Sequence, residues 1–254
     1  MIFLRAIIIF LTILLVWYLV TAITDAPPYI LPNPTLVIKA LISNVDLLFF
    51  HGLITLTEII LGLTIGLIFG TISAIFLAYY QPARQWLMPI LVISQAIPVF
   101  ALAPILVLWL GYGMASKVAM ATLIIYFPVT AAFFDGLQRT NIGFLDLAKT
   151  MNASKWRVLR YIRIPSAMPA LASGFRVATA VAPIGAIVGE WVGSSEGLGY
   201  LMLHANGRMQ IDVMFAALFT LSFMAIALYY TVDTILTRAL SWSPETRFNL
   251  QKDE

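Results

Sequence analysis

The sequence contains no cysteine and few charged residues. Without cysteine it has no disulfide bonds and no thiolate chemistry. Charged residues make up 11% and apolar residues 61% of the chain, against about 25% and about 45–50% in soluble domains. So few charges cannot cover a water-soluble fold that hides so many large apolar side chains. The composition therefore predicts an integral membrane protein.

The sequence also lacks the motifs of the common enzyme classes. No glycine is followed by lysine, so there is no phosphate-binding loop of the G-x-x-x-x-G-K-[ST] type. The two histidines, His51 and His204, are far apart in sequence and lie outside any H-E-x-x-H pattern, which argues against a zinc site. We expect no metal, no cofactor and no catalytic residue.

Six stretches are long and apolar enough to cross a bilayer, which takes about 20 residues. They cover residues 2–23, 53–78, 86–110, 116–134, 171–192 and 213–236. The first could instead be a cleaved signal peptide, but its apolar run is long and no A-x-A site follows, so we expect a retained span. Residues 35–50 are apolar but short, which favours an interfacial helix. The sequence thus predicts an all-α membrane protein with one transmembrane domain, residues 1–254.

The basic residues are distributed unevenly between the two sides of these spans. With the N-terminus in the cytoplasm, twelve of the fifteen lysines and arginines fall inside and only Lys39, Lys117 and Arg208 fall outside. Such a bias sets orientation in membrane proteins. We expect both termini to be cytoplasmic.

The centres of the six stretches carry no Asp, Glu, Lys or Arg, whereas ion-driven carriers commonly rely on ionisable groups within the membrane. Glu58 is the exception, about 8 Å below the external surface at 1.5 Å per residue. It either reaches the interface or an external cavity, or has a functional role. A transport protein without a nucleotide site or a central ion relay would take its energy from another subunit.

Residues 136–170 form the longest cytoplasmic connection. Phe144, Leu147, Ala148 and Met151 recur at the spacing of one helix face. Asn152 is a predicted helix stop, because Asn tolerates the left-handed conformation. A second apolar face follows at residues 156, 159 and 162, and we expect Pro165 to end that helix. The pattern indicates two short helices that meet at a turn; a hairpin held on anionic lipid would also produce it.

This segment resembles the cytoplasmic coupling loop of ABC-importer permeases, written E-A-A-x-x-x-G-A and followed by I-x-L-P. Asp146 stands for the Glu, Leu147 and Ala148 for the alanine pair, and Asn152 and Ala153 for Gly-Ala. The ending corresponds to Ile162, Ile164 and Pro165. Asp for Glu, Leu for Ala and Asn for Gly depart from the pattern; Asp keeps the charge, and Asn keeps tolerance of the left-handed conformation.

Further segments resemble the nitrate, sulfonate, taurine and pyrimidine branch of these permeases. They are Leu31-Pro32-Asn33-Pro34, Gly189-Glu190-Trp191 and Gly197-Leu198-Gly199-Tyr200. The resemblance implies a type I ABC importer permease in a bacterial inner membrane. It also implies a second, identical permease copy, two separate ATPase subunits, an external solute-binding protein and no nucleic acid. The residues that would contact the ATPase are Asp146, Ala148, Met151, Asn152, Ala153, Trp156 and Pro165.

Two further sets of residues are candidates for the transport pathway and its outer end. Polar or helix-bending residues of the third to fifth spans would line the pathway: Ser94, Gln95, Pro98, Tyr126, Thr179 and Pro183. Ordinary interhelical packing is the alternative for each of them. Residues for an external gate or for docking of the binding protein are Glu58, Glu190, Gly197 and Tyr200.

The substrate is less sharply indicated. Because the pathway lacks a central cation, a neutral or aromatic solute is favoured over a strong anion. Residues 189–200 most resemble permeases for thiamine-precursor pyrimidines, with aliphatic sulfonate, taurine or nitrate importers as rivals. An ion-coupled secondary carrier and a membrane enzyme are the alternatives from other classes.

Overall fold

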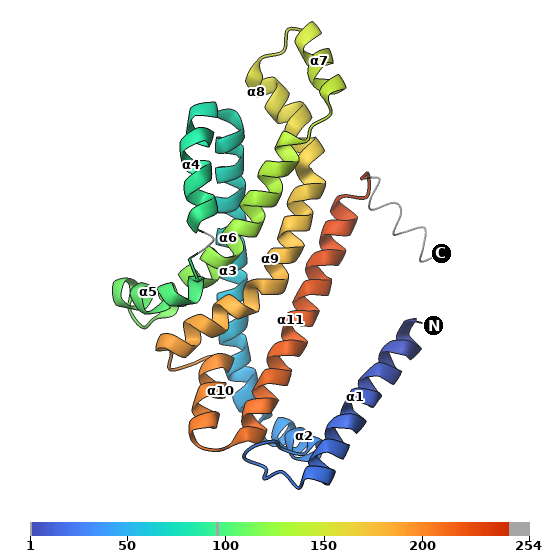
Figure 1. Cartoon of the computed structure of the whole chain (residues 1–254), viewed down its shortest axis with the longest axis vertical. Coiled ribbons are helices and arrows are strands. Elements are labelled where there is room, and N and C mark those ends of the chain that lie inside the picture. The colour runs from blue at the N-terminus through green and yellow to red at the C-terminus, as the bar shows by residue number, and fades with distance from the viewer. Residues whose placement is uncertain (1, 95–96, 244–254) are drawn as a thin grey trace.

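The computed structural model of the chain describes residues 2–94 and 97–243, and all regular structure in these ranges is helical. Four helices there are long and apolar enough to span a membrane: α3 (Val45–Tyr79), α6 (Met114–Gln138), α9 (Ile164–Gly193) together with the turns before it, and α11 (Ile211–Ala239). They confirm the second, fourth, fifth and sixth predicted spans as helices. The chain is an all-α integral membrane protein (Figure 1).

The first predicted span is occupied by α1 (Ile2–Thr24). The predicted interfacial helix at residues 35–50 is shorter than expected: α2 (Pro34–Ser43) ends at Asn44, and the residues beyond belong to α3. Asn33 caps α2 by accepting a hydrogen bond from the amide of Thr35, and Pro34 takes the first helical position. The Leu31-Pro32-Asn33-Pro34 motif therefore starts a helix.

The third predicted span is wrong as a single helix. The structure divides it into α4 (Gln81–Ser94), the 3-10 turn η1 (Val99–Leu102) and α5 (Ala103–Leu110). Pro98 lies at the break with an extended backbone and precedes η1. A proline has no amide hydrogen to continue a helix, and it biases the preceding residue away from helical angles. Apolar length alone could not reveal this interruption.

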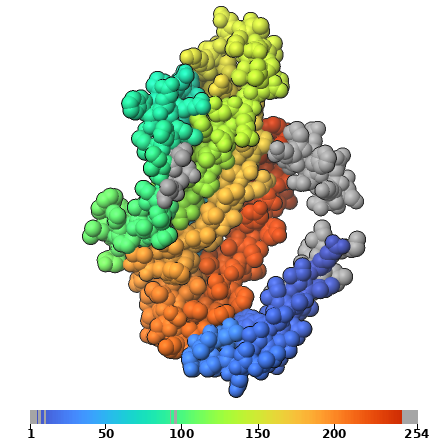
Figure 2. All heavy atoms as spheres, in the orientation of Figure 1, coloured from blue at the N-terminus to red at the C-terminus, as the bar shows by residue number. Residues whose placement is uncertain are grey.

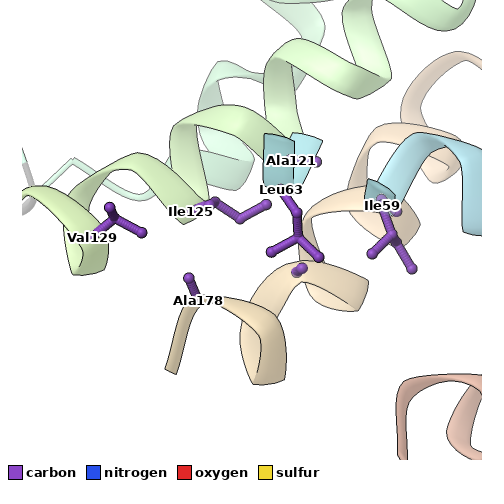
Figure 3. Packing of buried hydrophobic residues seen from close by; sticks show 8 residues of the cluster. Ile59, Leu63, Ala121, Ile125, Val129 and Ala178 are labelled. Carbon is purple, nitrogen blue, oxygen red and sulfur yellow. The ribbon is translucent and has the colours of Figure 1, made fainter. Parts of the chain in front are cut away.

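The core of the molecule is formed by α3, α6 and α9. One buried cluster joins all three helices: Ile59, Leu63, Ala121, Ile125, Val129, Ala178, Ala182 and Ala186 (Figure 3). Half of these residues are alanines, and the helices approach closely at glycines as well. A Cβ atom added at Gly62 would lie 2.6 Å from the Cβ of Ala121, and one at Gly66 would lie 2.6 Å from Cγ2 of Ile125. Small residues of this kind are typical of helix contacts in membranes.

The remaining helices lie at the two ends of the core and along two sides of it, with α4 and α5 on one side and α11 and α1 on the other (Figure 1). At one end, the loop end, α7 (Ile142–Thr150) and α8 (Lys155–Val158) project beyond the other helices (Figure 1). At the opposite end, the α10 end, lie α2 and α10 (Leu198–Gly207). Helix α1 leans away from the bundle (Figure 2) and touches α11 through Trp17, which stacks on Phe215 and Phe219 with ring centroids 5.6 and 5.9 Å apart.

Candidate functional site

The loop end contains a sharply defined helical hairpin. Asn152 has a φ of 53°, which confirms it as the left-handed stop after α7. Its amide donates to the carbonyl of Lys149 at 2.9 Å, and the amide of Ala153 donates to that of Ala148 at 2.9 Å. This pair of bonds closes the end of a helix in a Schellman arrangement. Ser154 then caps α8 by accepting from the amide of Arg157. Backbone hydrogen bonds therefore fix the turn between the two helices.

The expectation that Pro165 ends the second helix is wrong. Helix α8 continues through a π-helical turn, η2 (Leu159–Arg163), into α9, so that one helical segment of 39 residues runs from Lys155 to Gly193. In η2 the amide of Ile164 donates to the carbonyl of Leu159, five residues earlier. The wider turn lets the chain pass Pro165, whose ring would otherwise crowd a regular α-helical turn. The hairpin is thus joined to a long helix without a break.

The outer face of this hairpin is apolar. Six large side chains are at least half exposed there: Ile142, Phe144, Leu147, Met151, Trp156 and Tyr161. Four of them, Phe144, Leu147, Met151 and Tyr161, line a groove of about 500 Å³ together with Ala153 and Pro165. Ala148 also lines the groove but is itself only 3% exposed. Asp146 points to solvent and pairs with Lys149 at 3.0 Å.

Trp156 ties the hairpin to the core. Its ring meets that of Tyr79, at the end of α3, edge to face with centroids 5.9 Å apart. This contact packs the start of α8 against the end of α3. Of the predicted ATPase-contacting residues, four line the groove: Ala148, Met151, Ala153 and, from the start of α9, Pro165. Asp146, Asn152 and Trp156 lie on the hairpin but not in the lining of the groove.

At the α10 end, side chains from α3 and α9 hold the start of α10. The amide of Gly197 donates to Nδ1 of His51 at 3.0 Å, and the amide of Leu198 donates to Oγ1 of Thr55 at 2.8 Å. The amide of Gly199 donates to Oε2 of Glu190. The hydroxyl of Thr55 donates to Oε1 of Glu190 at 2.6 Å. The first backbone N–H groups of a helix have no partner within it. At the start of α10, side chains from α3 and α9 accept hydrogen bonds from three successive N–H groups.

A glycine is required at the head of α10. Gly197 has a φ of 107°, and a Cβ atom there would overlap the carboxyl group of Glu190. Tyr200, one turn later, is half-buried and stacks on His204 with ring centroids 5.4 Å apart. Both Gly197 and Glu190 are buried. Neither can contact a docked protein in this arrangement, so the structure does not place them on an external docking surface.

Glu58 forms a buried ion pair with Lys117, with Oε1 and Nζ 3.3 Å apart. The side chain of Glu58 is fully buried and that of Lys117 is 7% exposed. The expectation that Glu58 reaches the interface or an external cavity is therefore wrong. Lys117 lies in the first turn of α6. A cation and a carboxylate both withdrawn from solvent can remain charged only by compensating each other.

The predicted pathway residues do not gather at one place. Thr179 and Pro183 are buried on α9, and the hydroxyl of Thr179 donates to the carbonyl of Phe175 at 2.8 Å. Within one chain, both residues therefore belong to helix packing. Ser94 and Pro98 lie at the break between α4 and η1, and Gln95 falls outside the described residues. Tyr126 lies half-buried on α6 against Phe127.

Sequence reasoning missed several polar residues that the structure brings together. His51, Thr55 and Glu58 are spaced i, i+4 and i+7 on α3, so they share one helix face. That spacing was a usable signal. Nothing local indicated a second ion pair, in which Nε of Arg176 donates to Oδ1 of Asp233 at 2.5 Å between α9 and α11.

Comparison with known proteins shows the family to which the chain belongs. The sequence profile of the family described as "Binding-protein-dependent transport system inner membrane component" matches residues 62–241. The chain belongs to this family. It is similar to a solved structure of the MetNI methionine ABC transporter, with a TM-score of 0.66 and 20% identity over 78% of this chain and 97% of that one. That likeness establishes the fold of a type I ABC importer permease.

Three curated relatives cover nearly the whole permease. A probable ABC transporter permease protein of Haemophilus influenzae is 56% identical over 91% of this chain and 94% of its own. The formylaminopyrimidine transport permease protein ThiX of Halalkalibacterium halodurans is 36% identical over 92% and 93%. The riboflavin transport system permease protein RibX of Chloroflexus aurantiacus is 35% identical over 91% and 87%. The chain is therefore a membrane-embedded permease component of an ABC importer.

Proposed function

We propose that this permease forms the transport pathway as a pair of identical copies, and that a separate ATPase subunit binds each copy at the hairpin of α7 and α8. An external binding protein delivers the solute at the α10 end. The loop end and both termini then face the cytoplasm, in agreement with the bias of the basic residues. The chain itself carries no ATP hydrolysis.

The exposed apolar groove on the hairpin is the observation that carries this proposal. A contiguous apolar surface held outside a helix bundle marks an interaction site. The hairpin that carries the groove is held by the hydrogen bonds of its turn and by the Tyr79–Trp156 contact, so a bound partner can move the hairpin as a unit. The 39-residue helix that begins at Lys155 would carry such a push into the core. A flexible loop could not transmit the movement.

Replacing Ala153 with Glu tests the ATPase contact. Ala153 is half-buried in the groove, and a carboxylate there would be desolvated without a partner when the ATPase docks. Burying an unpaired charge costs several kcal/mol, comparable to an interface hot spot. We expect Ala153→Glu to abolish transport and co-purification of the partner ATPase, while membrane insertion persists.

Lys155→Glu is the matched control. Lys155 is exposed at the first position of α8 and does not line the groove. The same charge introduced there should leave most ATPase binding intact. If Ala153→Glu retains full transport and full ATPase association, the hairpin is only a surface element on the bilayer.

We further propose that the solute is a nitrogen heterocycle, with a thiamine-precursor pyrimidine as the first candidate. ThiX and RibX are named for formylaminopyrimidine and riboflavin, both nitrogen heterocycles. The test is uptake of labelled formylaminopyrimidine by cells that express the importer, with riboflavin, taurine, an aliphatic sulfonate and nitrate as competitors. Uptake of the label that unlabelled formylaminopyrimidine reduces, but taurine, sulfonate and nitrate do not, supports the proposal. Competition by taurine, sulfonate or nitrate would indicate a rival substrate.

A further inference from the structure

The attachment of α10 differs from ordinary helix packing. Apolar contacts do join it to its neighbours, since Leu198 and Leu201 share a buried cluster with Leu48 and Ala216. Its start, however, is bound through three amides to His51, Thr55 and Glu190, which we call the α10 clamp. Each of these hydrogen bonds joins a backbone amide at the start of α10 to a side chain of another helix. Because hydrogen bonds are directional, they also fix the orientation of α10, which apolar contacts do not.

Thr55 is the central residue of the α10 clamp. Its hydroxyl accepts from Leu198 of α10 and donates to Glu190 of α9, while its own backbone belongs to α3. It is fully buried, and Glu190 is 1% exposed. One side chain thus connects three helices. Loss of its hydroxyl would leave a buried amide and a buried carboxylate oxygen each without a partner, which is more costly than loss of an exposed bond.

The α10 clamp lies at one end of the helix that begins at the hairpin. Glu190 is three residues before the last residue of α9, and Lys155 is the first residue of the same 39-residue helical segment. At 1.5 Å per residue, the path along the axis of this segment, which includes the π-helical turn and the internal prolines Pro169 and Pro183, is about 58 Å. Movement imposed at the hairpin would therefore reach Glu190 through one continuous helix, and α10 is the element bound to it.

We infer that Thr55, Glu190 and His51 are positioning residues that make α10 move together with α3 and α9, so that the state of the ATPase is transmitted to the face that receives the binding protein. This inference rests on the proposed function. In it, the exposed residues Leu203 of α10 and Met209 in the turn after α10 face the binding protein. The clamp residues themselves remain buried and do not touch that partner.

Paired substitutions of Thr55 test the inference. Valine has the shape of threonine but no hydroxyl, whereas serine keeps the hydroxyl. The assay uses the assembled complex of permease and ATPase in proteoliposomes, with and without the binding protein. We expect Thr55→Val to reduce stimulation of ATP hydrolysis by the binding protein at least about tenfold, while basal hydrolysis and ATPase co-purification remain. Thr55→Ser should keep stimulation within about twofold of the unsubstituted complex.

A second pair of variants applies if Thr55→Val does not accumulate in the membrane. His51 is 7% exposed and contributes a single bond to Gly197. Asn can place an amide oxygen where Nδ1 lies, whereas Leu cannot accept a hydrogen bond. His51→Leu should weaken stimulation and His51→Asn should restore it.

The outcomes separate this inference from the proposed function. If the unsubstituted permease neither binds the ATPase nor supports ATP-driven uptake, the proposed function fails. If it does both, but the valine or leucine variant is stimulated as strongly as its serine or asparagine counterpart, the inference is overturned. It is also overturned if basal and stimulated hydrolysis fall in equal proportion, because that result indicates a structural role alone.

Discussion

Lys117 and Glu58 illustrate how single residues determine the interior of this permease. The two charges lie 3.3 Å apart and are both withdrawn from solvent. Their mutual attraction offsets the cost of desolvation only while both are present. Removing one partner leaves the other as an isolated buried charge.

We therefore expect Lys117→Met to destabilise the chain by about 3–5 kcal/mol. The measurement is thermal unfolding of the permease purified in detergent. Adding Glu58→Leu to the same chain should recover part of the loss, because it removes the carboxyl group that Lys117→Met leaves without its partner. An unchanged unfolding temperature for Lys117→Met would show that the ion pair is not a structural element.

Among the elements, the contact between α3 and α6 depends on glycine. An added Cβ at Gly62 would lie 2.6 Å from Ala121, whereas one at Gly52 on the same helix would have nothing within 4 Å. We expect Gly62→Ala to destabilise the bundle by about 1–3 kcal/mol through overpacking, and Gly52→Ala to be neutral or stabilising. Unfolding in detergent compares the two. Equal stability of the variants would mean that α3 and α6 are not closely packed at Gly62.

The elements also show which features the sequence could predict. Asn152 was predicted to stop its helix because the preference for left-handed angles is local to that residue, and the structure confirms it. Most spans follow from apolar length in the same way. The π-helical turn before Pro165 and the break near Pro98 depend on how the chain accommodates a proline, which apolar patterns do not specify.

The two candidate sites also differ in how far the sequence could predict them. The hairpin residues are close in sequence, so a motif could locate them. Thr55 and Glu190 are 135 residues apart, and their pairing depends on how α3 and α9 pack. The spacing of His51, Thr55 and Glu58 indicated a polar helix face, but not its partners. Sequence reasoning therefore selected Glu190 and Gly197 for an external gate or for docking, but could not show that both are buried at the start of α10.

At the scale of the whole molecule, the two ends of the permease should face opposite sides of the membrane. We expect reporter fusions after Gly113 and after Gly199 to give external signals, and a fusion after Arg139 to give a cytoplasmic signal. The basis is the excess of basic residues on the hairpin side. A cytoplasmic signal at Gly199 would contradict the orientation and place α10 on the wrong side for the binding protein.

The proposed paired pathway predicts the number of permease and ATPase chains in the complex. Native mass spectrometry of the complex should find two permease chains and two ATPase subunits, because one hairpin binds one ATPase. An odd number of permease chains would contradict the paired pathway. A complex of one such chain with a different permease would retain the hairpin contact but would not be a homodimer.

The central claim is that solute movement is driven by ATP hydrolysed in a partner subunit. The most direct measurement is uptake of labelled formylaminopyrimidine into proteoliposomes that contain the permease, with the ATPase, the binding protein and ATP each supplied or withheld. We predict accumulation only when all three are present, and no effect when ionophores collapse proton and sodium gradients. Uptake by the permease alone, driven by an imposed ion gradient, would contradict the account and identify a secondary carrier.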